Sequence, residues 1–219
     1  MKKPRICVTL VENNLETVKE LEPLIDLFEL RLDLIGPEWT ELAKFIKKPW
    51  IACNRSFEEG GRGNPNDVSR IEELLWAAEA GACIVDIEYR TKNLKDVIAT
   101  IKSKAQCLIS FHDMIGTPSY DTLVGIAEGQ LKAGADICKI VVTAQNFEDN
   151  LPILRLIRAF PKAKMVAFAM AEAGTLSRIL SPLAGGYFTY ACVEAGKESA
   201  VGQVPVKELI EIYQYLRKI

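Results

Sequence analysis

Lys139 is the residue whose place in the sequence is hardest to explain by packing alone. It lies in the apolar run ICKIVV (137–142), which has the composition of a buried strand. A lysine is rarely fully buried, because an unpaired charge inside a protein is costly. A structural interpretation is that its amine reaches solvent or pairs with a carboxylate. A chemical interpretation is that burial and nearby cations lower the pKa of the amine, so that a neutral nucleophile can attack a carbonyl carbon.

His112 is the only histidine in the chain and lies in the segment SFHD (110–113), one predicted strand before Lys139. An imidazole both accepts and donates a proton near neutral pH, so His112 is the candidate general acid/base. Either Glu59 or Glu88 could orient the ring by accepting its other N–H. The sequence does not separate these two glutamates.

Three arginines at the ends of predicted strands or in the following segment could bind a substrate: Arg31, Arg55 and Arg178. The planar guanidinium suits a carboxylate, so an anionic or hydroxylated small molecule is expected. A metal is not predicted, because one histidine and scattered cysteines give no ligand set with recognisable spacing. A magnesium site made only of carboxylates stays open.

Apolar runs rich in β-branched residues alternate with helical segments such as 68–80 and 120–133. Eight such runs occur: 5–10, 27–35, 50–54, 83–89, 107–113, 137–142, 165–170 and 187–192. This alternation predicts a parallel sheet of the α/β class, and eight units predict one (β/α)₈ TIM barrel spanning residues 1–219. An open doubly wound sheet is the alternative, but no GxGxxG follows the first run.

A barrel carries its chemistry at the carboxyl ends of its strands, and successive strand residues point to opposite faces. In ELRLD (29–33) the side chains of Glu29, Arg31 and Asp33 are therefore predicted to share one face of an extended strand. The same alternation places Ser110 with His112 and directs Lys139 into the barrel. The polar residues are thus expected to meet in one place.

Composition narrows the function further. The 219 residues carry 27 basic and 29 acidic side chains, a net charge of -2. The chain therefore lacks the excess of positive charge that is typical of nucleic-acid-binding proteins. The apolar start ends too early for a signal peptide, and no run approaches the length of a membrane span. We therefore expect a cytoplasmic protein with no membrane partner and with buried, reduced cysteines. A homodimer is compatible with the sequence, although the helix predicted over 206–216 is expected to pack on the barrel.

Seven motifs occur along nearly the whole chain: ELRLD, CNRSFEEGG, VDIE, SFHD, ADICKI, MAEAGTLSR and SAVGQ. Together and in this order they resemble the type I 3-dehydroquinate dehydratases (3-dehydroquinases), lyases of the shikimate pathway to chorismate and the aromatic amino acids. The resemblance implies a cofactor-free syn elimination of water from 3-dehydroquinate, giving 3-dehydroshikimate through a Schiff base. Val201 and Cys138 depart from the family, which often has proline at both positions.

The resemblance also implies roles for individual residues. Lys139 matches the imine-forming lysine, His112 the general acid/base and Glu59 the glutamate that orients this histidine. The matched substrate-binding positions are Glu29, Arg31, Arg55, Arg178, Ser199 and Gln203. Among these, Arg178 would hold the substrate carboxylate, while Ser199 and Gln203 belong to a closing loop after the eighth strand.

Two other functions compete with this interpretation. A class I aldolase or transaldolase would also use a barrel lysine, but its phosphate site belongs in the loops after strands seven and eight. Those loops, AEAGTLSR and VEAGKESAVGQ, contain no clear glycine-rich cradle. A non-catalytic barrel that binds a small anion would leave Lys139 merely paired with Glu88 or Asp86, and would form no covalent adduct.

Overall fold

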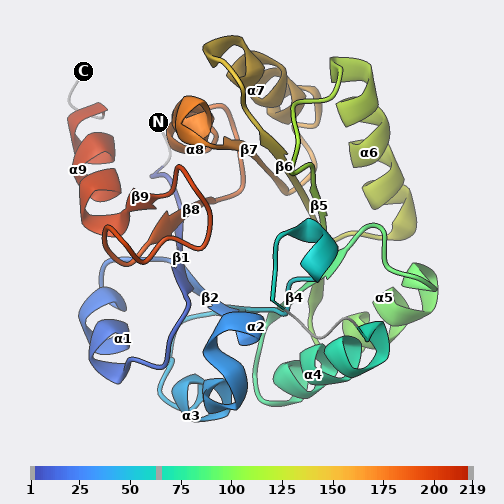
Figure 1. Ribbon diagram of the computed structural model, residues 1–219, viewed down its shortest axis with the longest axis vertical. Coiled ribbons are helices and arrows are strands. Elements are labelled where there is room, and N and C mark those ends of the chain that lie inside the picture. The colour runs from blue at the N-terminus through green and yellow to red at the C-terminus, as the bar shows by residue number, and fades with distance from the viewer. Residues whose placement is uncertain (1–2, 63–65, 217–219) are drawn as a thin grey trace.

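The strands form one curled sheet in which every pairing among the described residues is parallel (Figure 1). The computed structural model describes residues 3–62 and 66–216. Its strands are β1 (Ile6–Leu10), β2 (Leu27–Arg31), β3 (Trp50–Cys53), β4 (Ile84–Glu88), β5 (Gln106–His112), β6 (Ile137–Thr143), β7 (Met165–Met170), β8 (Thr189–Cys192) and β9 (Val204–Pro205). They lie in the order β7-β6-β5-β4-β3-β2-β1-β8-β9.

The sheet curls until β7 and β8 meet. The backbone N–H of Tyr187, just before β8, donates to the carbonyl of Met165 at the start of β7 over 2.7 Å. Further along the same strands the rings of Phe168 and Tyr190 make an edge-to-face contact, with centroids 5.8 Å apart. The predicted barrel architecture is therefore confirmed. Strand β9, two residues long, was not predicted from the sequence.

Helices surround the sheet on its outer side (Figure 1). They are α1 (Leu15–Leu21), α2 (Leu32–Ile35), α3 (Trp39–Ala43), α4 (Asp67–Glu79), α5 (Leu94–Lys102), α6 (Tyr120–Ala133), α7 (Asn150–Ala159), α8 (Thr175–Leu180) and α9 (Val206–Leu216). Short 3₁₀ turns are η1 (Gly36–Glu38), η2 (Phe57–Glu59), η3 (Phe147–Asp149) and η4 (Glu172–Gly174). Helix α6 shows why its ends were predictable: Ser119 caps its start and Gly134, at φ +103°, ends it.

The side chains inside the barrel are apolar near the amino ends of the strands and polar further along them. The inward-facing layer near the amino ends is apolar and includes Leu27, Ile51, Ile84, Leu108 and Ile137. Because strand side chains alternate, the next inward position lies two residues further along each strand. Those positions are Glu29, Cys53, Asp86, Ser110 and Lys139. The same alternation that builds the core therefore stacks a polar layer directly on top of it.

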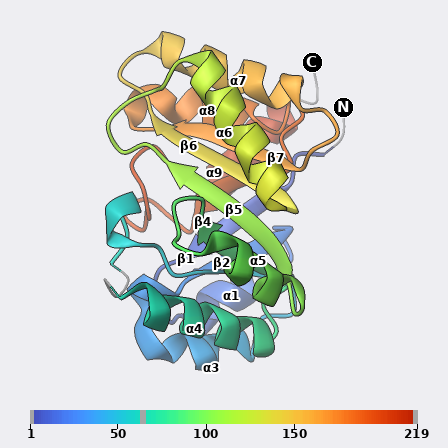
Figure 2. The same ribbon diagram turned by 90° about the vertical axis from the view of Figure 1, so that its right-hand side faces the viewer.

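Figure 2 shows the barrel from the side. Strands β5 and β6 lie next to each other and point the same way, with α6 outside them. The turn η2, drawn in cyan, lies at the end toward which these strands point. The carboxyl ends of the strands and the turn after β3 thus meet at one end of the barrel.

The prediction that the second strand extends to Asp33 is wrong. Strand β2 ends at Arg31, and Asp33 lies in the short helix α2. The cause is local hydrogen bonding, which competes with the sheet in polar residues such as aspartate. The Asp33 carboxylate accepts bonds from the Arg31 side chain and from the backbone N–H groups of Arg55 and Arg62. Asp33 thereby fixes the start of the segment that follows β3.

Helix α9 packs on the barrel as expected, burying Val206, Leu209 and Tyr213. The Tyr213 hydroxyl donates to the carbonyl of Ile179 over 2.9 Å, which ties α9 to α8. No helix among residues 3–62 and 66–216 combines the length and the apolar character needed to cross a membrane.

Candidate active site

A cavity of about 370 Å³ opens at the carboxyl ends of the strands. It is lined by all nine residues to which the family resemblance gives a role: Glu29, Arg31, Arg55, Glu59, His112, Lys139, Arg178, Ser199 and Gln203. They come from six strands or from the segments that follow them, and they meet only because the sheet curls. The barrel therefore brings together residues that lie up to 174 positions apart, from 29 to 203.

Lys139 is buried in the floor of this cavity, with 4% of its surface exposed. Its Nζ lies 2.9 Å from Oδ2 of Asp86 and 3.4 Å from Oε2 of Glu29. Burial alone would lower the pKa of Lys139, but the carboxylates of Asp86 and Glu29 outweigh it and raise the pKa above its ordinary value. The expectation of a lowered pKa is therefore wrong for this structure. The resting amine is an ammonium held by two carboxylates.

Asp86 is the centre of the hydrogen-bond network around Lys139. It also accepts bonds from Arg55 Nη2 at 2.7 Å and from the Ser110 hydroxyl at 2.6 Å. Although burial acts in the opposite direction, Arg55 and Lys139 hold the pKa of Asp86 well below its usual range. Asp86 thus stays ionised and fixes both cations beside it.

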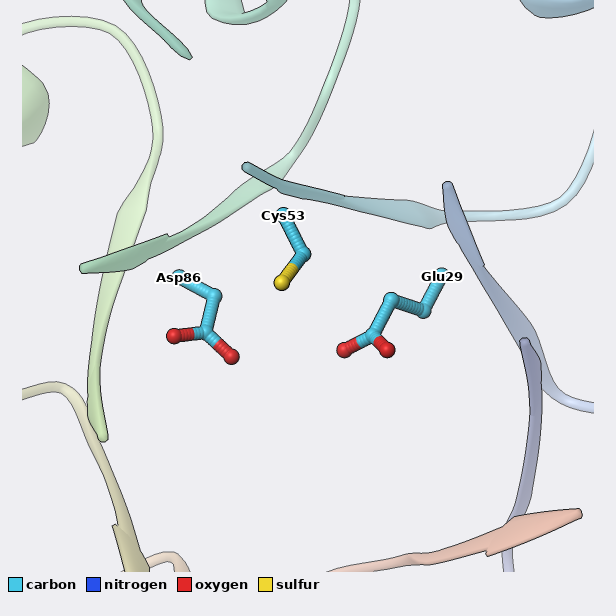
Figure 3. A group of neighbouring side chains, drawn as sticks. All are labelled: Glu29, Cys53 and Asp86. Carbon is cyan, nitrogen blue, oxygen red and sulfur yellow. The ribbon is translucent and has the colours of Figure 1, made fainter. Parts of the chain in front are cut away.

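Glu29, Cys53 and Asp86 point toward one another from three neighbouring strands, and each could offer one ligand atom to a metal ion (Figure 3). Positive charge is already supplied to this group by the protein. The Lys139 ammonium contacts both carboxylates, and Arg55 Nη2 contacts Asp86 and lies 3.4 Å from the Cys53 sulfur. Burial also raises the pKa of the Cys53 thiol, which disfavours the thiolate that a metal requires. The two carboxylates of this group are therefore better suited to be counter-ions of the Lys139 ammonium than ligands of a metal ion.

His112, at the end of β5, forms a hydrogen bond with Glu59 from η2. The distance from Nδ1 of His112 to Oε2 of Glu59 is 2.7 Å. Burial, together with Arg55 and Lys139, lowers the pKa of His112 well below its ordinary value, so the imidazole is neutral. Burial raises the pKa of Glu59 to about 7. When Nδ1–H donates to ionised Glu59, the lone pair lies on Nε2 and is available as a base.

Glu88, the other candidate partner of the histidine, has a different environment. It lies between two arginines, accepting from Arg55 Nη1 at 3.0 Å and from Arg70 Nη1 at 2.6 Å, and it also accepts the backbone N–H of Ser56. Arg70 comes from α4, is fully buried and donates as well to the carbonyl of Asn54. Glu59 is therefore the hydrogen-bond partner of His112, whereas Glu88 forms an ion pair with Arg55.

Arg178 differs from the other two arginines in lacking a carboxylate. Arg31 donates from Nε and Nη2 to Asp33, and Arg55 contacts Asp86 and Glu88. Among the described residues Arg178 has no ion pair; it only faces the Phe168 ring at 4.3 Å and donates a long bond to the Val201 carbonyl.

Burial without a counter-ion lowers the pKa of Arg178 to about 9. A buried arginine of this kind at a cavity wall is suited to an anion that arrives with the ligand. The segment after β8 lies beside it, where Gln203 Oε1 accepts the backbone N–H of Ser199 at 2.8 Å.

Two aromatic side chains of the cavity were missed by the sequence reasoning. Tyr190 on β8 and Phe168 on β7 line the cavity and face Lys139 and Arg178 with their rings. Tyr190 had a signal in the sequence, because strand alternation in YFTYAC places it on the same face as Phe188. The sequence offered Asp86 only as a possible partner of Lys139 in a non-catalytic barrel, and its contact with both Lys139 and Arg55 needed the structure.

Comparison with known proteins gives a consistent result. The family model described as type I 3-dehydroquinase matches residues 6–219. The 3-dehydroquinate dehydratase of Dehalococcoides mccartyi is 44% identical over 215 residues, covering 98% of this chain and 96% of the relative. That of Methanocaldococcus jannaschii is 36% identical over 219 residues, covering 96% and 98%.

Solved structures agree. The type I 3-dehydroquinate dehydratase of Clostridium difficile, determined with covalently modified comenic acid, superposes with a TM-score of 0.86 at 25% identity, covering 99% of this chain and 93% of that one. The 3-dehydroquinate dehydratase of Geobacillus kaustophilus gives 0.87 at 25% identity, with coverages of 99% and 92%.

Proposed function

This chain belongs to the type I 3-dehydroquinase family, and on that premise we propose that it dehydrates 3-dehydroquinate through a Schiff base on Lys139, with His112 as general acid/base. The family consists of 3-dehydroquinate dehydratases, which are hydro-lyases of the shikimate pathway. The observation that carries the proposal is a buried lysine in the floor of a cavity that also contains a neutral, oriented histidine and an unpaired arginine.

The proposed reaction begins at Lys139. Its ammonium gives a proton to Nε2 of the neutral His112, and the free amine attacks the substrate carbonyl carbon. His112 passes this proton to the carbonyl oxygen, which takes a second proton from the nitrogen and leaves as water as the C=N bond forms. The protonated imine draws electrons from the neighbouring carbon more strongly than a ketone does, so its C–H becomes acidic enough for a histidine. Asp86 and Glu29 balance the positive charge on the nitrogen before this step.

His112 is proposed to move the proton. Nε2 accepts the proton from the carbon beside the imine, and the electron pair passes toward the nitrogen to give an enamine. The protonated imidazole then donates that proton to the departing hydroxyl, which leaves as water, and hydrolysis of the imine releases the product and restores the amine. Glu59 assists both proton transfers, because its carboxylate accepts a hydrogen bond from Nδ1–H and stabilises the imidazolium that forms.

Arg178 is proposed to bind the substrate carboxylate, while the segment containing Ser199 and Gln203 covers the ligand. Arg178 is the cavity arginine without a carboxylate of its own, so an incoming carboxylate would satisfy its buried charge. Its contact with the Val201 carbonyl joins this arginine to the covering segment, which would exclude water from the imine.

Intact-protein mass measurement after incubation with 3-dehydroquinate and borohydride tests the proposal. The wild-type protein should gain the mass of one reduced substrate adduct, and Lys139→Ala should gain none. Lys207→Ala serves as the matched control, because Lys207 lies on the surface in an ion pair with Glu20. Absence of an adduct in the wild type, or its persistence in Lys139→Ala, would remove the assignment.

A further inference from the structure

Tyr190 lies against the nitrogen that the proposed reaction modifies. The Nζ of Lys139 is 4.4 Å from the centroid of the Tyr190 ring, within the range of a cation–π contact. Tyr190 is buried, with 3% of its surface exposed, so the contact is shielded from water and is stronger than a similar pair on the surface.

The ring is held in place by other aromatic side chains. Phe188 and Phe168 contact it edge to face, with centroids 5.4 and 5.8 Å away. These contacts fix the orientation of the ring, and the Lys139 ammonium lies over its face. The Tyr190 hydroxyl is buried, and it interacts with the Glu29 carboxylate, which helps to raise the pKa of the phenol. The part of Tyr190 that contacts the Lys139 nitrogen is the face of its ring.

We propose that the ring face of Tyr190 is a catalytic contact that keeps the Lys139 nitrogen positively charged, first as the ammonium and then as the iminium. The inference rests on the proposed function, since it requires an imine at Lys139.

The number of N–H groups on the nitrogen explains why a ring is needed in addition to the carboxylates. An ammonium has three N–H donors and satisfies both Asp86 and Glu29. An iminium has one, so it can keep a hydrogen bond to only one of them. The attraction of a cation to a ring face depends on charge and needs no N–H. The contact with Tyr190 can therefore persist through the conversion.

Several other groups act on the charge of Lys139. The charged or titratable side chains that act on it, besides Tyr190 itself, are Asp86, Glu29, Arg55, Cys53, His112 and Cys7, from strands β1 to β5 and the segment after β3. None of them is altered when the electron density of the Tyr190 ring alone is changed. A graded series of ring substitutions therefore isolates the contribution of the ring.

The experiment replaces Tyr190 by phenylalanine and by phenylalanines carrying one, two and three fluorine atoms. Fluorine withdraws charge from the ring face with little change in size. For each protein, the fraction trapped by borohydride with 3-dehydroquinate is measured across pH by intact mass. From the unfluorinated to the trifluorinated ring we expect the pH midpoint of the Lys139 amine to fall steadily, and the trapped iminium at neutral pH to fall about 5- to 30-fold, the range expected for a desolvated cation–π contact.

The same fluorinated series at Phe188 is the matched control, because this ring lies in the same apolar layer but touches Tyr190 and not the lysine. The substitutions at Phe188 should change neither the pH midpoint of the Lys139 amine nor the amount of trapped iminium. A flat response along the series at position 190, with a normal adduct in the wild type, would overturn the role of the ring. No adduct in the wild type would instead refute the proposed function, so the two failures are distinguishable.

Discussion

Nδ1 of His112 and Oε2 of Glu59 lie 2.7 Å apart, although the two residues are 53 positions apart in the chain. This pair fixes which ring nitrogen faces the cavity. Glu59 comes from the short turn η2 after β3 and His112 from the end of β5, so the barrel must form before the pair exists.

Glu59→Gln should lower kcat by about 10²-fold, because the neutral amide cannot stabilise the imidazolium, a loss typical of impaired general acid/base catalysis. Adduct formation on Lys139 should persist. In the wild type, whose Glu59 pKa is raised to about 7, kcat/KM should fall as pH drops through that value, because the protonated carboxyl no longer accepts from Nδ1–H. The variant should lack this acidic limb in a kcat/KM profile from about pH 5 to about pH 9. An unchanged limb would assign it to another group.

Arg178→Met should abolish tight substrate binding and yet stabilise the fold. The pKa of Arg178 is lowered to about 9 in the folded protein, so its charged form is disfavoured there. This cost is fully present below that value and declines as pH rises from there toward the ordinary pKa of arginine. Replacing a buried unpaired charge by an apolar side chain should raise the free energy of unfolding by about 1–4 kcal/mol. Urea unfolding at neutral pH measures this.

Arg158→Met is the control for that experiment, because Arg158 is exposed on α7. It should change stability by less than about 0.5 kcal/mol. A destabilised Arg178→Met protein would show that packing on the Phe168 ring outweighs the cost of the buried charge.

Gly202→Ala should raise KM about 10-fold, since a loss of about 1.4 kcal/mol in binding is a factor of ten. A Cβ at Gly202 would lie 2.5 Å from the Ala171 carbonyl oxygen, and Gly202 has φ +85°, so the segment after β8 could not approach the end of β7. Ala171 itself has φ +66°, which indicates that this junction is already strained.

Gly196→Ala is a matched control in the same segment. Gly196 has φ +88° but nothing within 4 Å of its added Cβ, so it shares the backbone strain without the collision. Steady-state kinetics should show a normal KM for this variant. Equal KM values for the two variants would assign the effect to backbone strain and not to contact with β7.

Arg70→Met should lower the free energy of unfolding by about 3–5 kcal/mol, because it removes one partner of a buried ion pair. Glu88 would then have only Arg55 for its charge, and Arg55 would be drawn away from Asp86. The double variant Arg70→Met/Glu88→Gln should recover part of the loss, because no carboxylate charge remains buried without its partner.

Asp67→Asn is the control for Arg70, because it weakens only the half-exposed outer contact at 3.1 Å. It should cost less than about 1 kcal/mol in denaturant unfolding. A loss in the double variant equal to that in Arg70→Met would show that the methylene packing of Arg70 matters more than its charge.

The sequence by itself determined the elements and the faces of the strands. Residues 120–133 and 206–216 are helical as predicted, because their caps and apolar spacing are local properties. The alternation of strand residues correctly turned Lys139 inward above Ile137. It failed at Asp33, where side-chain hydrogen bonds ended the strand two residues early.

Only the tertiary structure decided which charges meet. The choice of Glu59 over Glu88 for His112, the ammonium state of Lys139 beside Asp86, and the unpaired Arg178 all depend on distances between strands that are far apart in the chain. A pKa is set by burial and by neighbours within a few ångströms, and periodicity along one strand carries no information about either. The sequence therefore predicted that these side chains lie at the carboxyl ends of the strands, and the closing of the sheet determined their partners and charges.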